Sequence, residues 1–270
     1  MRKVLSILIG AVLLSSSLSG SALADFKDGL VGYWPFDETS GQVAHSLVPA
    51  SADGQLYNFP DDDSQWVPGQ IGGALHFRGP NFLDYVIADH YPVATTAVSF
   101  SGWVFADDNS VQWQSIFKNS GGATGQFHFG LRDTTKTLAI SVAQATNNAS
   151  SGSAIDYTDP IFPTGQWVHV GFTADTTLHG LIAYLKLYRN GQLVGIRPFD
   201  GTLREDGDRG GKMSIGMGVK TNDVGDGPGG PPGYWQGSFD DFGLWNRVLS
   251  DDEMAQIYAL GQNGKSFYSP

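Results

Sequence analysis

The 270-residue chain contains no cysteine. This absence excludes disulfide bridges, thiolate metal sites and a lipid-modified cysteine. With 41% hydrophobic residues, the chain is long and apolar enough to form a sizeable core. The fold must therefore be held together by that core, or by a hard cation bound to acidic oxygens.

Basic residues are also scarce. The chain has 16 Lys and Arg residues against 27 Asp and Glu residues, which gives a net charge of −11. Two of the basic residues, Arg2 and Lys3, lie at the very start, so a chain that begins at residue 25 has 14 basic residues and a net charge of −13. Nucleic acid and anionic membrane surfaces need a basic binding face. We therefore expect neither as a partner.

Long hydrophobic runs are absent after residue 24, so no membrane span is expected there. Residues 1–24 combine a basic start, an apolar run from Val4 to Leu14, a serine-rich stretch and an Ala-Leu-Ala ending. This pattern is typical of a secretory signal peptide of bacterial type, whereas a membrane anchor would need about 20 apolar residues. We expect cleavage after Ala24, a mature chain of residues 25–270 that forms one domain, and a secreted or periplasmic location.

Short strand-like runs make up most of the remaining chain. Apolar residues alternate with polar ones, and the runs are bounded by Gly, Pro, Asn or Asp, which predicts an antiparallel all-β sandwich. Asn190-Gly191, between two such runs, predicts a two-residue hairpin with positive φ at both turn positions. The predicted strands cover 30–36, 74–78, 84–88, 97–105, 113–118, 126–131, 137–143, 166–174, 182–189, 192–197, 212–219 and 235–245.

One short helix is expected near the C-terminus. Ser250 is a capping residue, and Glu253 follows three positions later, as in a capping box. Met254, Ile257 and Tyr258 then form an apolar stripe with helical spacing. The pattern predicts a short amphipathic helix that packs against the sandwich.

Four stretches, in this order, resemble the laminin-G-like members of the concanavalin A-like lectin/glucanase superfamily. The resemblance implies a jelly-roll sandwich of two antiparallel sheets, in which the N-terminal strand lies beside the strand 235–245. Trp167 and His169 resemble the family's tryptophan-histidine strand. His169 is either a catalytic base or a histidine within a core strand, and we expect the second because no acidic residue lies two positions away to orient it. Lectins, enzyme domains and adhesion modules all occur on this fold, so it does not decide the function. The four stretches are "GLVGYWPFDETSG" (29–41), "WVPGQIGGALHFRG" (66–79) with "DYV" (84–86), "QWVHVGFTADTT…LYRNGQLVG" (166–195) and "GSFDDFGLWNRVLSDDEMAQIY" (237–258).

Glutamate is rare as well, and this bears on catalysis. It occurs only at Glu38, Glu205 and Glu253. β-Glucan hydrolases of this fold carry a Glu-x-Asp-x-x-Glu pattern on one strand, because retaining hydrolysis needs two carboxyl groups about 5 Å apart. That pattern is absent, and "QFHFGL" (126–131) is only a distant echo of a polysaccharide-lyase motif. We expect a non-catalytic binding protein; a polysaccharide-degrading enzyme and a protein-binding adhesion module are the alternatives.

Aromatic residues in loops are the candidates for ligand binding, because aromatic faces pack against the C–H surfaces of sugars. Tyr234 and Trp235 follow a long loop rich in Gly and Pro, and Trp113 lies at the start of a predicted strand. Asp226, within the long loop, is a further candidate for the same site. The expected ligand is a polysaccharide or another glycan, with a surface protein as the alternative.

Two aspartates are the candidates for a metal site. Simple alternation along the strand 235–245 places Asp240 on the side of Phe242 and Leu244, and Asp241 on the opposite side. Asp37 ends the neighbouring N-terminal strand, and many relatives hold a structural calcium with residues that match "FDE" and "FDD". We therefore expect Asp37 and Asp240 to bind calcium, which takes six to eight oxygen ligands. The alternative is that Asp37 starts an Asx-type turn and Asp240 accepts backbone hydrogen bonds.

Overall fold

The structure is a computed structural model of the chain. It describes residues 25–49, 51–88, 96–110, 114–121, 124–132, 135–142, 154–156, 161–175, 183–199, 203, 213–216 and 233–269. The predicted signal segment, residues 1–24, lies outside the described residues.

The first sheet, sheet A, consists of eight strands in antiparallel pairings. Their order is β14-β13-β12-β7-β16-β5-β4, and β1 pairs with β16 off this path. The strands are β1 (Leu30–Trp34), β4 (Trp66–Pro68), β5 (Gly73–Arg78), β7 (Ala97–Ala106), β12 (Trp167–Asp175), β13 (Ala183–Arg189), β14 (Gln192–Phe199) and β16 (Gln236–Trp245).

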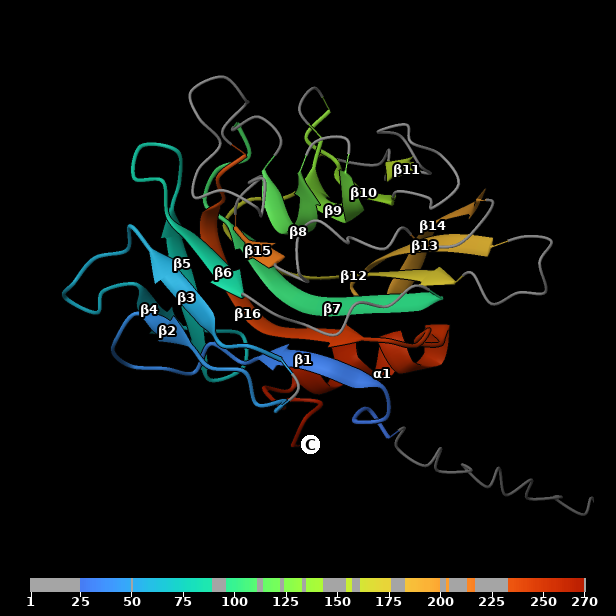
Figure 1. The fold of residues 1–270 in the computed structure, drawn as a ribbon, viewed down its shortest axis with the longest axis horizontal. Helices are drawn as coiled ribbons and strands as arrows, with labels where there is room; N and C mark the ends of the chain where they lie inside the picture. Colours follow the sequence, from blue (N-terminus) through green and yellow to red (C-terminus); the bar gives the residue numbers. More distant parts are fainter. Residues whose placement is uncertain are drawn as a thin grey trace, which may run out of the picture.

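The second sheet, sheet B, also has eight described strands, in the order β11-β10-β9-β8-β15-β6-β3-β2. The neighbouring strands are again antiparallel. Figure 1 shows β8, β9 and β10 of this sheet facing β7 and β12 of sheet A. The strands are β2 (Val43–Ala44), β3 (Gly54–Tyr57), β6 (Tyr85–Ala88), β8 (Ser115–Gly121), β9 (Thr124–Leu131), β10 (Leu138–Val142), β11 (Ala154–Asp156) and β15 (Met213–Ile215).

A layer of aromatic side chains joins the two sheets. Phe100 of β7 stacks on Phe117 of β8 with ring centroids 5.0 Å apart, and Phe172 of β12 meets Phe129 of β9 at 5.2 Å. All four side chains are completely buried and belong to one hydrophobic cluster that both sheets supply. This is the interior expected of two face-to-face sheets, and it confirms the predicted all-β sandwich.

The two ends of the described chain meet in sheet A, as expected. β1 runs antiparallel to β16, with Leu30 opposite Trp245 and Trp34 opposite Phe242. The other half of the same edge of β16 pairs with β5, where Phe239 lies opposite Leu75. β16 therefore keeps β7 on one side and exchanges β5 for β1 on the other.

The helix α1 (Asp251–Gln262) covers the outer face of sheet A, on the side away from sheet B (Figure 1). Its Tyr258 stacks on Trp103 of β7 with ring centroids 5.6 Å apart, while Met254 lies against Gly171 of β12. Ser250 and Glu253 form the predicted capping box. Within the described ranges, no helix has both the length and the apolar character needed to cross a membrane.

The predicted hairpin is also present between β13 and β14, where Asn190 has a φ of 50° and Gly191 a φ of 71°. Most residues rarely adopt positive φ, and an Asn-Gly pair is the usual choice for a two-residue turn that requires it at both positions. Four short strands, β2, β3, β4 and β11, were not predicted. They have two to four residues each, too few for an alternating pattern to emerge.

Replacing the cap of α1 tests how much the helix contributes. Ser250 accepts a hydrogen bond from the Glu253 backbone N–H at 3.1 Å, and Ser250→Ala leaves that donor without its partner. We expect a loss of about 1 kcal/mol in the free energy of unfolding, seen as a fall of about 2–4 °C in a calorimetric melting temperature. Ser250→Asn, which retains a capping oxygen, serves as the control and should melt close to the wild type.

Candidate functional site

The outer face of sheet B carries aromatic and polar side chains. In β6, Val86 and Ala88 point into the shared core, so Tyr85 and Ile87 point outward. In β3, Leu56 is in the core, and its neighbour Tyr57 faces outward for the same reason. Alternation therefore separates the interior of the sandwich from an accessible surface on sheet B.

Three tyrosines and one isoleucine form a small cluster on this face, which we call the tyrosine cluster: Tyr57, Tyr85, Ile87 and Tyr234. Tyr57 and Tyr85 are cross-strand partners, and their rings stack with centroids 4.8 Å apart and planes 6° from parallel. Tyr85 is buried beneath the others, whereas Tyr57 and Tyr234 are half-buried. Burial, and then the neighbouring Tyr57 and Tyr234, raise the pKa of Tyr85, so its hydroxyl stays neutral. The cluster offers flat aromatic surface beside phenolic hydroxyl groups.

A buried ion pair fixes the start of β6 beside this cluster. Asp84 is fully buried and immediately precedes Tyr85. Its carboxylate accepts hydrogen bonds from Arg78 Nε at 2.9 Å and from Arg78 Nη2 at 2.7 Å. The same guanidinium lies 4.3 Å from the ring centre of Phe82, of which 51% is exposed. A bidentate pair of this kind is rigid, so it holds the loop between β5 and β6 in place.

Polar side chains occupy the other half of the face. Lys118 of β8 and Ser141 of β10 are the cross-strand partners of His128 on β9. Ser115 Oγ lies 2.8 Å from His128 Nε2, which fixes the orientation of the imidazole. Burial of the ring, followed by the positive charges of Lys118 and Arg132, lowers the pKa of His128 to about 3. The ring is therefore neutral at physiological pH.

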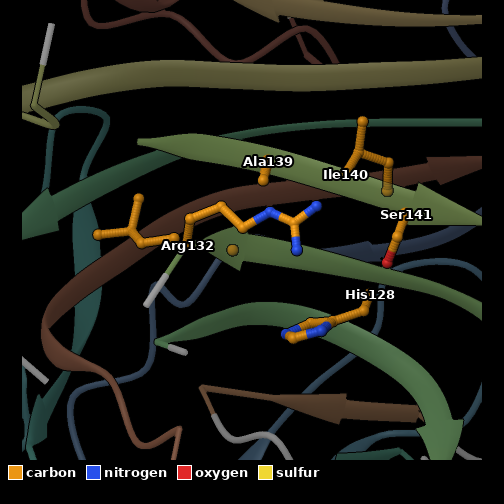
Figure 2. A pocket seen from close by; sticks show the side chains of 7 residues that line it. His128, Arg132, Ala139, Ile140 and Ser141 are labelled. Atoms are coloured by element: carbon orange, nitrogen blue, oxygen red, sulfur yellow. The ribbon is translucent and has the colours of Figure 1, made fainter. Parts of the chain in front are cut away.

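A small pocket opens beside His128, between β9 and β10 (Figure 2). Arg132 extends back along β9 in this view, with its guanidinium toward the side of the pocket that holds Ser141 and His128. Gly130 and Ala139, which are cross-strand partners, contribute little side-chain bulk. The residues that line the pocket are His128, Gly130, Leu131, Arg132, Ala139, Ile140 and Ser141.

The predicted ligand residues have different outcomes. Tyr234 lies in the tyrosine cluster. Trp235 was predicted as its partner in ligand binding, and this is wrong: the side chain is fully buried in the core, and its indole N–H donates to the Phe105 carbonyl at 3.2 Å. Adjacent residues of an extended segment point to opposite sides, so one of the pair turns inward. Trp113 and Asp226 lie outside the described residues.

Sequence reasoning missed the other members of this face. The predicted binding residues were aromatics in loops. The residues missed lie in strands, as Tyr57, Tyr85 and His128 do, or directly after one, as Arg132 does. A usable signal was present in "QFHFGL", where His128 stands between Phe127 and Phe129. A polar residue between two apolar ones in a strand marks the outward face.

The paired aspartates of β16 lie at a β-bulge. The pairing register with β7 shifts between Asp240 and Gly243, and Asp241 has a φ of 51°. Simple alternation predicted Phe239 and Phe242 on opposite sides, but both lie in the core with ring centroids 4.9 Å apart. The extra residue of a bulge breaks the period of two. The prediction that Asp241 faces away from Asp240 is therefore wrong, and both carboxylates are buried.

Each aspartate accepts a hydrogen bond from a different segment. Asp240 Oδ2 accepts from the Ile71 N–H at 2.7 Å, and Asp241 Oδ1 accepts from the Tyr33 hydroxyl at 2.5 Å. Asp37, which is exposed, accepts from the Gly73 N–H at 2.6 Å. Burial raises the pKa of Asp241 to about 6. Burial, and then the charge of Asp241, raise the pKa of Asp240 well above its usual value.

These acids meet part of what a calcium site requires. Asp240 Oδ1 and Asp241 Oδ2 are buried and have no hydrogen-bond partner. The negative charge of Asp37 contributes to the raised pKa of both aspartates, so the three carboxylates influence one another. Within the described part of the chain, no group of three or more His, Cys, Asp or Glu residues is arranged closely enough to hold a metal. A calcium ion at this position would need further ligands from backbone carbonyls or water.

His169 is a core residue, as expected. It is fully buried on β12, its Nε2 lies 2.8 Å from Ser101 Oγ, and its ring packs against Trp103 with centroids 5.3 Å apart. Burial lowers the pKa of His169 to about 3. A neutral, enclosed histidine of this kind contributes to packing.

The family comparison agrees with this architecture. The laminin G-type model of the concanavalin A-like lectin/glucanases superfamily matches residues 83–255, which is more than half of the chain. The chain belongs to this superfamily. A comparison with curated proteins finds no match.

Solved structures show the same fold at low sequence identity. Domain 4 of AbnA, a GH43 extracellular arabinanase from Geobacillus stearothermophilus, is 18% identical with a TM-score of 0.57, and the match covers 84% of this chain and 97% of that domain. The botulinum neurotoxin serotype D binding domain is 15% identical with a TM-score of 0.55, over 86% of this chain and 52% of the other. The binding domain of botulinum neurotoxin DC is 12% identical with a TM-score of 0.54, over 87% and 52%. This chain thus spans about half the length of the two toxin chains.

Removing the Tyr33 hydroxyl tests the hydrogen bond to Asp241. Tyr33→Phe removes one hydrogen-bond donor from a buried carboxylate that also interacts with the Ser266 side chain, and hydrogen bonds to charged groups contribute about 1.5–3 kcal/mol. We expect a loss of that size in the free energy of urea unfolding at pH 8. Tyr268→Phe is the control, because its hydroxyl bonds the Leu47 carbonyl at an exposed position. Equal losses in the two variants would show that the Asp241 contact has no special importance.

Proposed function

We propose that this protein is a secreted, non-catalytic carbohydrate-binding protein that holds its glycan on the outer face of sheet B. The observation that carries the proposal is the tyrosine cluster, in which the stacked rings of Tyr57 and Tyr85 lie beside the half-buried Tyr234. Aromatic rings bind the C–H faces of sugars, while nearby polar groups bind their hydroxyls. The proposal that the protein is secreted rests on residues 1–24, which resemble a signal peptide.

The structural relatives support a glycan as the ligand class. The arabinanase domain was solved in complex with arabinotriose, and the neurotoxin DC binding domain in complex with SialylT. The chain shares their fold, and it places aromatic and polar side chains on one accessible face. A surface protein as ligand is the alternative that binding experiments must exclude.

We also propose a structural calcium, held by Asp37 and Asp240. Its support is the pair of buried carboxylate oxygens without partners, Asp240 Oδ1 and Asp241 Oδ2. Buried negative charge is costly unless a cation or a proton balances it. The cation would stabilise the junction at which β16 exchanges β5 for β1.

Truncating Tyr234 tests the glycan proposal. On an array of plant, algal and bacterial polysaccharides, we expect the wild type to be retained by at least one glycan. Tyr234→Ala should bind that glycan about tenfold more weakly, since ring stacking contributes about 0.5–1.5 kcal/mol beyond the apolar area that the ring buries. Tyr234→Phe, which keeps the ring, should retain most of the affinity.

The same array separates the alternative functions. Release of reducing or unsaturated sugar ends from any polysaccharide would identify an enzyme and overturn the non-catalytic proposal. If the protein binds none of the glycans, an adhesion or structural role becomes the better explanation.

Chelation tests the calcium. We expect EDTA to lower the calorimetric melting temperature, and calcium chloride to restore it in a concentration-dependent manner, because a ligand that binds only the folded state adds to its stability. Asp240→Asn should abolish this response, whereas Asp252→Asn, at an exposed position on α1, should retain it. An unchanged transition in EDTA would contradict the proposed site.

A further inference from the structure

We infer that the pocket between β9 and β10 binds an anionic substituent of the glycan, a carboxylate or a sulfate ester, and that the protein therefore selects acidic polysaccharides. This inference rests on the proposed function, because it places the pocket on the same face as the tyrosine cluster. It adds the chemical class of the ligand, which the aromatic surface alone does not define.

The first argument is the local charge. A chain that begins at residue 25 has a net charge of −13, yet this part of sheet B carries Lys118 and Arg132 close enough to His128 for both to lower its pKa. None of the seven residues that line the pocket is acidic. Basic side chains beside a pocket without acidic lining residues attract anions locally.

The second argument is the chemistry of the lining. The guanidinium of Arg132 presents a planar fork of donors that matches a carboxylate or a sulfate. Figure 2 shows it on the side of the pocket where the Ser141 hydroxyl and the His128 ring also lie. Because the imidazole is neutral and Ser115 fixes its orientation, it adds a hydrogen-bonding group without further charge. One cation and two neutral polar groups suit a single anionic substituent.

The third argument is the floor of the pocket, which the fold keeps open. A Cβ atom on Gly130 would lie 2.1 Å from the Gln114 carbonyl oxygen, so no other residue fits there without a backbone shift. Ala139 stands opposite Gly130 on β10. Contact with the Gln114 backbone therefore requires a glycine at position 130, and this glycine adds no side chain to the pocket lining.

The fourth argument is continuity with the tyrosine cluster. Cross-strand partners lead from His128 to Lys118, then to Ser214 and to Ile87, which is a member of that cluster. Three strand spacings of about 4.8 Å separate the two ends of this row, or about 14 Å. An oligosaccharide of a few units spans this distance, with one sugar ring on the tyrosines and an acidic sugar at the pocket.

Matched polysaccharides test this inference. Polygalacturonate, alginate and hyaluronan are each compared by calorimetry and affinity electrophoresis with their carboxyl-reduced forms, which keep the backbone and lose the charge. Dextran sulfate and dextran form the sulfate arm. We expect the wild type to bind at least one acidic member at least tenfold more tightly than its neutral counterpart, and the arm in which this occurs distinguishes a carboxylate from a sulfate ester.

Variants locate the effect. Arg132→Gln should weaken binding of the preferred acidic glycan by about tenfold to a hundredfold and leave the neutral counterpart unaffected. Lys265→Gln removes the same charge from an exposed position beyond α1 and should behave as the wild type. Melting temperatures of both variants are measured to verify that they fold.

The outcomes separate the two proposals. Equal affinity for acidic and neutral members, or equal losses in Arg132→Gln and Lys265→Gln, would overturn the pocket assignment. If Tyr234→Ala still abolished glycan binding in that case, the proposed function would stand. Absence of binding to every polysaccharide would overturn both. Chemical-shift changes of the His128 ring on addition of galacturonate, but not of glucose, would support the pocket directly.

Discussion

The architecture depends on the exchange of neighbours along β16. Its first half pairs with β5 and its second half with β1, so one edge of a central strand serves two different partners. The bulge at Asp240 and Asp241 lies at the change-over. There Asp240 accepts a hydrogen bond from the Ile71 backbone N–H, just before β5, and Asp241 accepts one from the Tyr33 hydroxyl of β1. The two carboxylates thereby connect β16 to both partners at the change-over.

This arrangement gives the two outer faces of the sandwich different roles. The outer face of sheet A is occupied by α1, whose residues pack on β7 and β12. Sheet B instead presents half-buried aromatic rings at one end of its outer face and, at the other, a neutral histidine near Lys118 and Arg132. The buried acids and the tyrosine cluster thus lie on different sheets.

Most of the fold could be predicted from the sequence, because period-two alternation, the Asn190-Gly191 turn and the Ser250 cap are local signals. The site was harder to predict. Tyr234 and Trp235 are adjacent aromatic residues that the sequence does not distinguish. Only the packing of the sandwich places Trp235 in the core and Tyr234 on the outer face of sheet B. The orientation of Asp240 and Asp241 relative to each other was mispredicted. A bulge depends on which strands pair with β16, and these strands are distant in the sequence.

The junction also affects the order in which the molecule can assemble. The Tyr33 and Asp241 side chains that meet there are 208 residues apart in the chain. Contacts of such high sequence separation form slowly, since a long loop must close before they are made. During synthesis, β1 emerges long before β16, the strand with which it pairs. Sheet A is therefore completed only after the C-terminal segment arrives.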